Sequence, residues 1–271
     1  MFPVAVAQLN STDHVETNLK QILELIAVAA AKNPKPKVVF FPENSLYFRI
    51  NSSDSVQAIN MSDTSINQIS VLANQLNIYV HLTTAMEQNG KTFNSSVLFS
   101  PNENPRIIYN KIHLFDVFIP GQQPIAESKV FTAGDSAQTF TLENILFGSS
   151  ICYDIRFSEL YSAYARKNVH VLVVPSAFLV KTGQAHWMTL LKARAIESQC
   201  FVIASAQSGK HESIKFPGEF RETFGHSVVF DPWGDQLALK ESGVGVITAE
   251  LDLSRWESVR TAIPMPTHRR L

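Results

Sequence analysis

One cysteine stands where a nucleophile could act. Cys152 lies in residues 145–160 (ILFGSSICYDIRFSEL), between an apolar run and a helical pattern. This pattern predicts a buried strand, a tight corner at the cysteine and then a helix. At a helix N-terminus the dipole and the free N–H groups can lower the pKa of a thiol and hold an oxyanion. Cysteine is also among the residues most often buried as inert core, so this segment alone leaves both interpretations open.

Two charged residues also follow apolar strand patterns. Glu43 ends the segment KVVFFPE (residues 37–43), and Lys111 follows RIIYN (106–110). A carboxylate at a buried strand end can act as a general base. Taken alone, each residue also fits an ordinary role, Glu43 as a cap or rim residue and Lys111 as a surface residue that terminates its strand.

Other catalytic arrangements have weaker support. Among eight histidines, His113, His186 and His226 lie nearest to structured segments, but none is accompanied by the Asn or Asp pattern of Cys–His enzymes. No two histidines have the H-x-x-x-H spacing of a helical zinc site, so we expect no metal. Cys200 begins an apolar strand pattern and is expected in the core. Neither G-x-G-x-x-G nor G-x-x-x-x-G-K-[ST] occurs, so no nucleotide cofactor is expected.

The composition is that of a globular protein without a strong charge. Of 271 residues, 45% are hydrophobic and 17% are charged, and the net charge is −1. Because Lys and Arg are dispersed, neither nucleic acid nor a membrane is an expected partner. The two cysteines form no C-x-x-C pair, which fits a reducing compartment. No basic leader occurs, nor any apolar run of about 20 residues, so we expect a cytoplasmic protein.

The elements that must position these residues alternate strands with helices only in part. Helices are expected from about residue 13, around 66–76, after the cysteine, over 185–198 and over 253–262. Strands are expected at residues 3–9, 37–43, 78–83, 95–100, 106–110, 138–142, 145–150, 169–175, 200–206 and 226–230, followed by two closing strands. Residues 112–134 and 208–222 are expected as loops. Two mixed sheets with helices on their outer faces fit this order better than a doubly wound sheet, and the lack of linkers predicts one domain over residues 1–271.

The three strand ends together have a specific resemblance. FFPEN at Glu43, YNKIHLFD at Lys111 and SSICYDIRF at Cys152 resemble the catalytic motifs of the nitrilase superfamily of carbon–nitrogen hydrolases, in the same order. Matching segments extend along nearly the whole chain: VAVAQLNST, IPGQQPIAESKVFTAGD, PSAFLVKTGQAHW, KARAIESQCF, FGHSVVFDPWG and HRR. The departures are small: Ser158 replaces the proline of a usual RFPEL, and Asn44-Ser45 replaces a more common alanine after the glutamate.

The resemblance implies a mechanism and a fold. Glu43 would take the proton of the Cys152 thiol, and the thiolate would attack an amide carbon. Lys111 and a backbone N–H just after Cys152 would stabilise the oxyanion, and Glu127 in AESK would orient Lys111. The implied fold is an α/β fold, the α-β-β-α sandwich of two mixed sheets flanked by helices. No cofactor is implied, and the chain is expected as a homodimer to which the last helix and the HRR tail contribute.

The resemblance also narrows the substrate to a small-molecule amide. The segments KARAIESQCFVIASAQ and GHSVVFDPWG resemble the Nit branch, whose members hydrolyse deaminated glutathione to 2-oxoglutarate and Cys-Gly. The α-keto carboxylate of that substrate would need a cation, and Arg156 offers a bidentate guanidinium. Phe178 and Thr182 would line the acyl pocket. An ion pair with Asp154 or Glu159 is the alternative role of Arg156.

Three other functions stay open on the sequence. The first is an ω-amidase acting on α-ketoglutaramate, or another hydrolase of small amides such as a nitrilase or a carbamoylase. The second is a Cys–His or disulfide-exchange enzyme, which would depend on a histidine instead of Lys111. The third is a catalytically silent scaffold, against which the intact set of charged and nucleophilic residues argues.

Overall fold

Two six-stranded mixed sheets form the centre of the computed structural model, which describes residues 1–118 and 125–270. The first sheet has the order β16-β1-β2-β3-β4-β5, and the second has the order β15-β14-β11-β10-β9-β8. The strands of the first are β1 (Phe2–Gln8), β2 (Val38–Phe40), β3 (Tyr79–Gln88), β4 (Lys91–Phe99), β5 (Arg106–Asn110) and β16 (Gly245–Leu251). Those of the second are β8 (Thr139–Leu142), β9 (Ile145–Ser149), β10 (Val171–Val173), β11 (Phe201–Ala204), β14 (Ser227–Phe230) and β15 (Gln236–Lys240).

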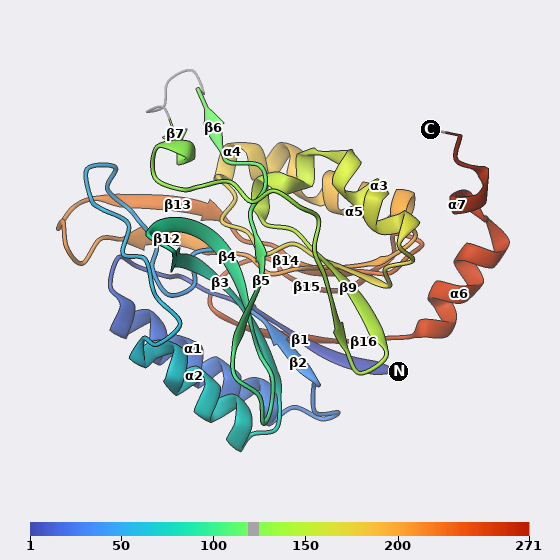
Figure 1. Ribbon diagram of the computed structural model, residues 1–271, viewed down its shortest axis with the longest axis horizontal. Helices are drawn as coiled ribbons and strands as arrows, with labels where there is room; N and C mark the ends of the chain where they lie inside the picture. The colour runs from blue at the N-terminus through green and yellow to red at the C-terminus, as the bar shows by residue number, and fades with distance from the viewer. Residues whose placement is uncertain (119–124, 271) are drawn as a thin grey trace.

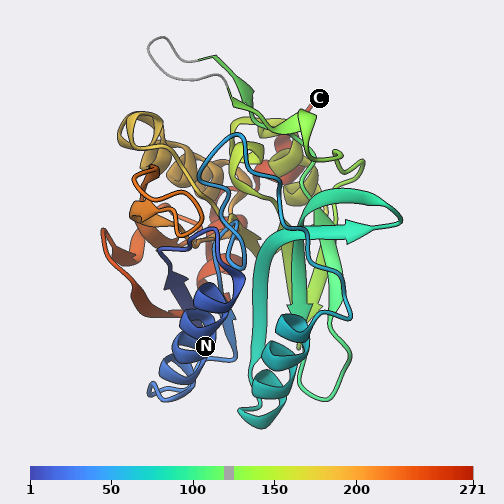
Figure 2. The ribbon, with the colours of Figure 1, turned by 90° about the vertical axis from the view of Figure 1, so that its left-hand side faces the viewer.

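The two sheets pack face to face, and helices cover their outer faces (Figure 1). Alternation along β1 shows how: Phe2, Val4 and Val6 join a core that both sheets share, while Ala5 and Ala7 pack into the core under the helices. Helices α1 (Val15–Ala30) and α2 (Thr64–Gln75) lie side by side on the first sheet (Figure 2). Helices α3 (Ser158–Arg166) and α5 (Met188–Ser198) cover the second sheet. The expected α-β-β-α sandwich is therefore confirmed.

The strand directions bring the ends of several strands to one edge. In the first sheet β1, β2 and β3 are parallel, and β5 runs in the direction of β3 because each pairs antiparallel with β4. In the second sheet β9, β10 and β11 are parallel. Residues that follow β2, β5, β9 and β10 can therefore meet beyond the carboxyl ends of the strands, the usual place for a site in such sheets.

Two segments expected as loops contain regular structure. Residues 208–222 were expected as a polar loop, but β12 (Ser208–Glu212) pairs with β13 (Phe220–Phe224) as an antiparallel hairpin. The polar composition hid these strands, because much of the hairpin faces solvent. The loop at 112–134 contains β6 (Asp116–Val117), β7 (Ile125–Ala126) and a 3₁₀ turn (Glu127–Lys129); residues 119–124 of this expected loop lie outside the described residues.

The helix expected from residue 185 begins earlier. A short α4 (Val180–Thr182) runs into a π-helical turn (Gly183–Trp187) and then into α5. Gly183 explains the close packing there, because a Cβ atom on it would lie 2.4 Å from Cβ of Phe224. The early start places Thr182 inside the first turns of the helix and at the wall of the pocket described below.

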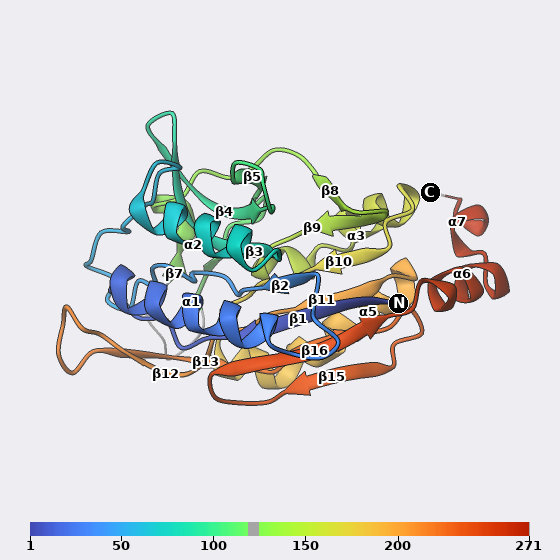
Figure 3. The same cartoon turned by 90° about the horizontal axis from the view of Figure 1, so that it is seen from below.

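The C-terminal segment lies at one end of the sandwich (Figure 3). Helix α6 (Leu253–Ala262) has the predicted bounds, and α7 (Met265–His268) follows it. The guanidinium of Arg269 donates hydrogen bonds to Oγ of Ser162 and to the carbonyl oxygen of Glu197, so part of the tail docks on its own chain. Within residues 1–118 and 125–270, no helix has the length and apolar character needed to span a bilayer.

Candidate active site

A buried lysine lies between two carboxylates at the shared edge of the sheets. Lys111 directly follows β5, and Glu43 lies three residues beyond β2. Nζ of Lys111 is 2.9 Å from Oε1 of Glu43, and 2.8 Å and 3.0 Å from the two carboxylate oxygens of Glu127. Glu127 comes from the 3₁₀ turn and is also fixed by the backbone N–H of Phe115, which donates to it over 2.6 Å. The structure thus brings together three residues that the sequence had singled out.

The surroundings of Lys111 favour its charged form. Only 2% of its side chain is exposed, and burial alone would lower the pKa of Lys111. The carboxylates of Glu127 and Glu43 more than offset that effect and keep the pKa well above its usual value. The site therefore presents a fixed ammonium, which can stabilise negative charge on a bound molecule.

Asn94 joins the same cluster and was missed by the sequence analysis. Its side-chain amide donates to Oε1 of Glu43 (2.8 Å) and to Oε1 of Glu127 (3.1 Å). The register of β4 on β5 brings it here, because the backbone N–H of Lys111 donates to the carbonyl oxygen of Asn94. The sequence did carry a signal, because residues 94–96 (NSS) are three consecutive polar residues directly before the apolar end of the strand, Val97 to Phe99. In the structure all three are buried.

Cys152 sits on a sharp corner after β9. Its φ of 48° is in the left-handed region, which is strained for a residue with a side chain. The buried carboxylate of Asp154 holds the corner by accepting hydrogen bonds from the hydroxyl of Tyr109 and from the backbone N–H groups of Ile151 and His113. Gly148 allows α3 to pack close to β9, because a Cβ atom on residue 148 would lie 2.8 Å from the ring of Tyr164.

The pKa of the Cys152 thiol is raised, contrary to the expectation from a helix N-terminus. Burial and the neighbouring carboxylate of Glu43 raise this pKa well above its usual value, and the ammonium of Lys111 only partly opposes them. The turn that follows is a five-residue 3₁₀ helix (Cys152–Arg156), too short for a strong dipole. The thiol is therefore neutral at rest and needs a base as it reacts. Glu43 is adjacent, and its other oxygen accepts the backbone N–H of Ala177 over 2.9 Å.

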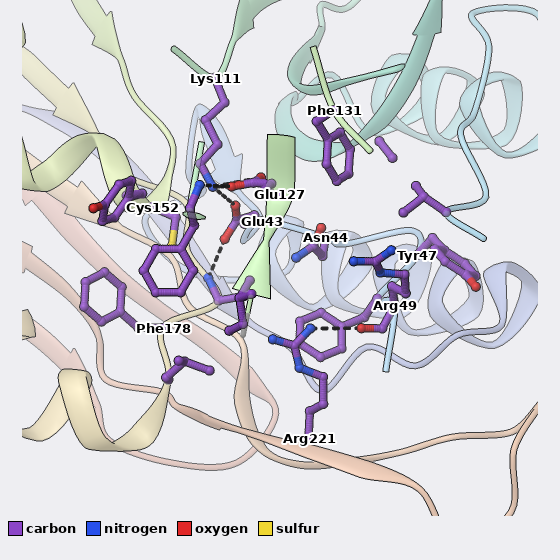
Figure 4. Close-up of a pocket in the computed structure, with 18 of the residues that line it drawn as sticks. Glu43, Asn44, Tyr47, Arg49, Lys111, Glu127, Phe131, Cys152, Phe178 and Arg221 are labelled. Carbon is purple, nitrogen blue, oxygen red and sulfur yellow. Dashed lines mark hydrogen bonds and ion pairs between the residues drawn. The ribbon is translucent and has the colours of Figure 1, made fainter. Parts of the chain in front are cut away.

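These groups open onto one pocket, which encloses about 840 Å³ of space, part of it continuous with solvent (Figure 4). The seven residues that the sequence analysis assigned to catalysis or substrate binding all line it: Glu43, Lys111, Glu127, Cys152, Arg156, Phe178 and Thr182. The wall also includes Arg49 and Arg221, which the sequence analysis missed because neither lies in a motif that it recognised.

Arg156 lies among aromatic rings beside the nucleophile. Its guanidinium carbon is 5.4 Å from the ring centre of Phe178 and 5.8 Å from that of Tyr153, and Nη1 is 3.3 Å from Nδ1 of His186. The alternative role in an ion pair with Asp154 or Glu159 has no support, since none of the ion pairs between described residues joins Arg156 to either carboxylate.

The remaining cysteine and the histidines lie elsewhere. Cys200 is fully buried, and its thiol donates to the carbonyl oxygen of Val169 over 3.0 Å, which confirms the expected core position. His113 packs against Asp154, and neither it nor His186 or His226 lines the pocket. In the described part of the chain, no group of three or more His, Cys, Asp or Glu side chains could hold a metal ion.

Fold and site together are those of a carbon–nitrogen hydrolase. The model of the Carbon-nitrogen hydrolase family matches residues 3–261, and the chain belongs to this family, within the nitrilase superfamily. It is 39% identical over 270 residues to "Probable hydrolase nit2" of Schizosaccharomyces pombe, an alignment that covers 96% of this chain and 95% of the relative. It is 37% identical to "Deaminated glutathione amidase" of Mus musculus, over 98% of this chain and 83% of the relative.

Solved structures of related proteins have the same fold. The NitFhit protein of Caenorhabditis elegans superposes with a TM-score of 0.85 at 33% identity, over 99% of this chain and 65% of that longer protein. Nit3 of Saccharomyces cerevisiae, described as a member of branch 10 of the nitrilase superfamily, superposes with a TM-score of 0.80 at 29% identity, over 100% of this chain and 97% of that one.

Proposed function

We propose that this hydrolase cleaves the amide bond of deaminated glutathione, releasing 2-oxoglutarate and Cys-Gly. Relatives from mouse and from Synechocystis that carry the name deaminated glutathione amidase support this substrate, at 37% and 34% identity over 98% of the chain. The observation that carries the proposal is the position of Arg156. A guanidinium that lies against Phe178 and Tyr153 and lines the same pocket as Cys152 suits the α-keto carboxylate of the acyl group.

In the first half-reaction, the carboxylate of Glu43 takes the thiol proton of Cys152 as sulfur bonds to the amide carbon. Moving the proton from thiol to carboxylate leaves the net charge of the site unchanged. The oxyanion lies between the ammonium of Lys111 and the backbone N–H after Cys152. The tetrahedral intermediate collapses as its C–N bond breaks. Glu43 returns the proton to the departing amine, and a thioester remains.

In the second half-reaction, Glu43 acts again as the base. It takes a proton from a water molecule, whose oxygen attacks the thioester carbon, and the same oxyanion contacts form. The C–S bond breaks, the thiolate recovers the proton from Glu43, and 2-oxoglutarate leaves. The contacts of Glu127 with Lys111 and with the backbone N–H of Phe115 support a positioning role, in which Glu127 holds the ammonium in place and charged.

A comparison of two amides tests the substrate. Purified protein is assayed with deaminated glutathione and with α-ketoglutaramate, which share the acyl group and differ only in the leaving amine. The proposal expects a higher kcat/KM for deaminated glutathione. A clear preference for α-ketoglutaramate would make the protein an ω-amidase, and no turnover of either compound would favour a silent scaffold or another amide substrate.

The assembly and the location are further parts of the proposal. A cytoplasmic homodimer is expected, with α6 and the tail near the interface. Exposed apolar side chains in this region support it: Ile196 and Ile263 are 45% and 43% exposed, and Trp233 is 50% exposed. Light scattering after size exclusion measures the mass, and a monomer at micromolar concentration would contradict the dimer.

A further inference from the structure

Two arginines line the pocket without a carboxylate partner. Arg49 lies in the segment after β2, and Arg221 lies on β13. The Nη1 group of Arg221 donates to the backbone carbonyl oxygen of Arg49 over 3.1 Å, and its guanidinium carbon lies 5.4 Å from the ring centre of Phe48. The ion pairs between described residues include neither arginine. No other hydrogen bond between described residues uses the guanidinium donors of Arg221, so these donors can bind a ligand.

The two guanidiniums place two positive charges close together at this wall of the pocket. Burial lowers the pKa of Arg221, and the charge of Arg49 lowers it further, while Glu43 and Glu127 act in the opposite direction. Arg221 stays charged at neutral pH, because even a depressed arginine pKa lies far above it. A bound anion would relieve the mutual repulsion of the two guanidiniums.

The arginine pair lies across Glu43 from the nucleophile Cys152. Figure 4 shows Cys152 and Phe178 on one side of Glu43, and Arg49 and Arg221 on the other. Glu43 is the proposed proton donor to the departing amine, so the amine must extend past it. The acyl carboxylate has Arg156 on the near side, and a second anion would reach the arginine pair on the far side.

We infer that Arg49 and Arg221 form a second anion subsite, which binds a carboxylate at the far end of the amine part of the substrate. This inference rests on the proposed function and deepens it. The amine of a dipeptide spans two residues, or about 7 Å, before its terminal carboxylate. The substrate class is thus an amide with a carboxylate at each end, held by one arginine on the acyl side and by two on the amine side.

The test compares deaminated glutathione with the same compound amidated at its C-terminal carboxylate. Wild-type protein should prefer the free carboxylate by about 10- to 100-fold in kcat/KM, the usual worth of charge-assisted hydrogen bonds. Arg221→Met and Arg49→Met should each reduce this ratio by raising KM for the free carboxylate. Arg221→Lys keeps the charge but loses the planar fork, so it should lower the ratio less than Arg221→Met and gives a second reading if Arg221→Met folds poorly.

Arg106→Met is the matched control, because it removes an exposed arginine at the start of β5 and away from the pocket. Its ratio should equal that of wild type. Equal kcat/KM for the two compounds in wild type, or an unchanged ratio in folded arginine variants, overturns the inference even if deaminated glutathione is a good substrate. If deaminated glutathione is not hydrolysed at all, the proposed function fails first, and the absence of turnover in wild type identifies that case.

Discussion

Replacing Lys111 with methionine should separate the stability of the site from its chemistry. The change removes an ammonium from between Glu43 and Glu127 while nearly keeping the volume of the side chain. Removing one partner of a buried ion pair costs about 3–5 kcal/mol of unfolding free energy, because the remaining charge stays buried and unpaired. Here two carboxylates are left, and both accept a hydrogen bond from the side-chain amide of Asn94. We therefore expect a loss of unfolding free energy in the upper part of that range. Loss of an oxyanion donor should lower kcat by at least about 100-fold.

A double variant distinguishes the two effects. Lys111→Met with Glu127→Gln also removes one of the unpaired carboxylates, so it should recover part of the lost stability and none of the lost kcat. Lys37→Met is the control, since it breaks an exposed ion pair with Glu143 at 3.0 Å and should cost at most about 1 kcal/mol. Urea unfolding gives the free energies, and initial rates give kcat. A folded Lys111→Met protein with kcat within about threefold of wild type would refute the proposed role of the ammonium.

Three other substitutions test separate parts of the account. Asn94→Asp adds a third carboxylate beside Glu43 and Glu127, so it should lower kcat more than Asn94→Ala does, and equal rates would contradict the shared-amide arrangement. Arg156→Lys should mainly raise KM for α-keto acid amides; unfolding of this variant, seen by circular dichroism, would mean a structural role instead. Burial lowers the pKa of His81 to about 3, below its unfolded value of about 6.5. Between these two pH values the unfolded chain binds more protons than the folded one, so the free energy of unfolding falls as the pH drops from about 6.5 to about 3. His81→Leu should reduce the fall by up to about 1.4 kcal/mol per pH unit, measured by urea unfolding at pH 7 and pH 5, and an identical pH dependence would show that His81 does not titrate on unfolding.

Residues at the ends of apolar strands were predictable from the sequence. Glu43, Lys111 and Cys152 each follow a clear strand pattern, and parallel strands of a sheet bring their carboxyl ends together. The hairpin β8–β9 and the last helix were also found, because turn residues and caps mark their limits locally. Local signals therefore gave most of the fold and the catalytic candidates.

What could not be predicted depends on contacts between distant segments. Arg221 lies on β13, whose polar sequence carries no strand pattern, and it meets Arg49 only through the folded hairpin. Asn94 depends on the pairing of β4 with β5, which brings it beside Lys111. The raised pKa of Cys152 also escaped prediction, since it follows from burial and from Glu43 far away in the sequence.

Intact-mass spectrometry after a rapid quench tests the central claim most directly. Wild-type protein mixed with deaminated glutathione should gain the mass of one 2-oxoglutaryl group, and peptide mapping should locate it on Cys152. Cys200→Ala should form the same adduct and keep its activity, because Cys200 is fully buried in the core. Cys152→Ala should form no adduct and lose turnover. A Cys152→Ala protein with near-normal turnover, or an adduct that maps to another residue, would contradict the covalent mechanism.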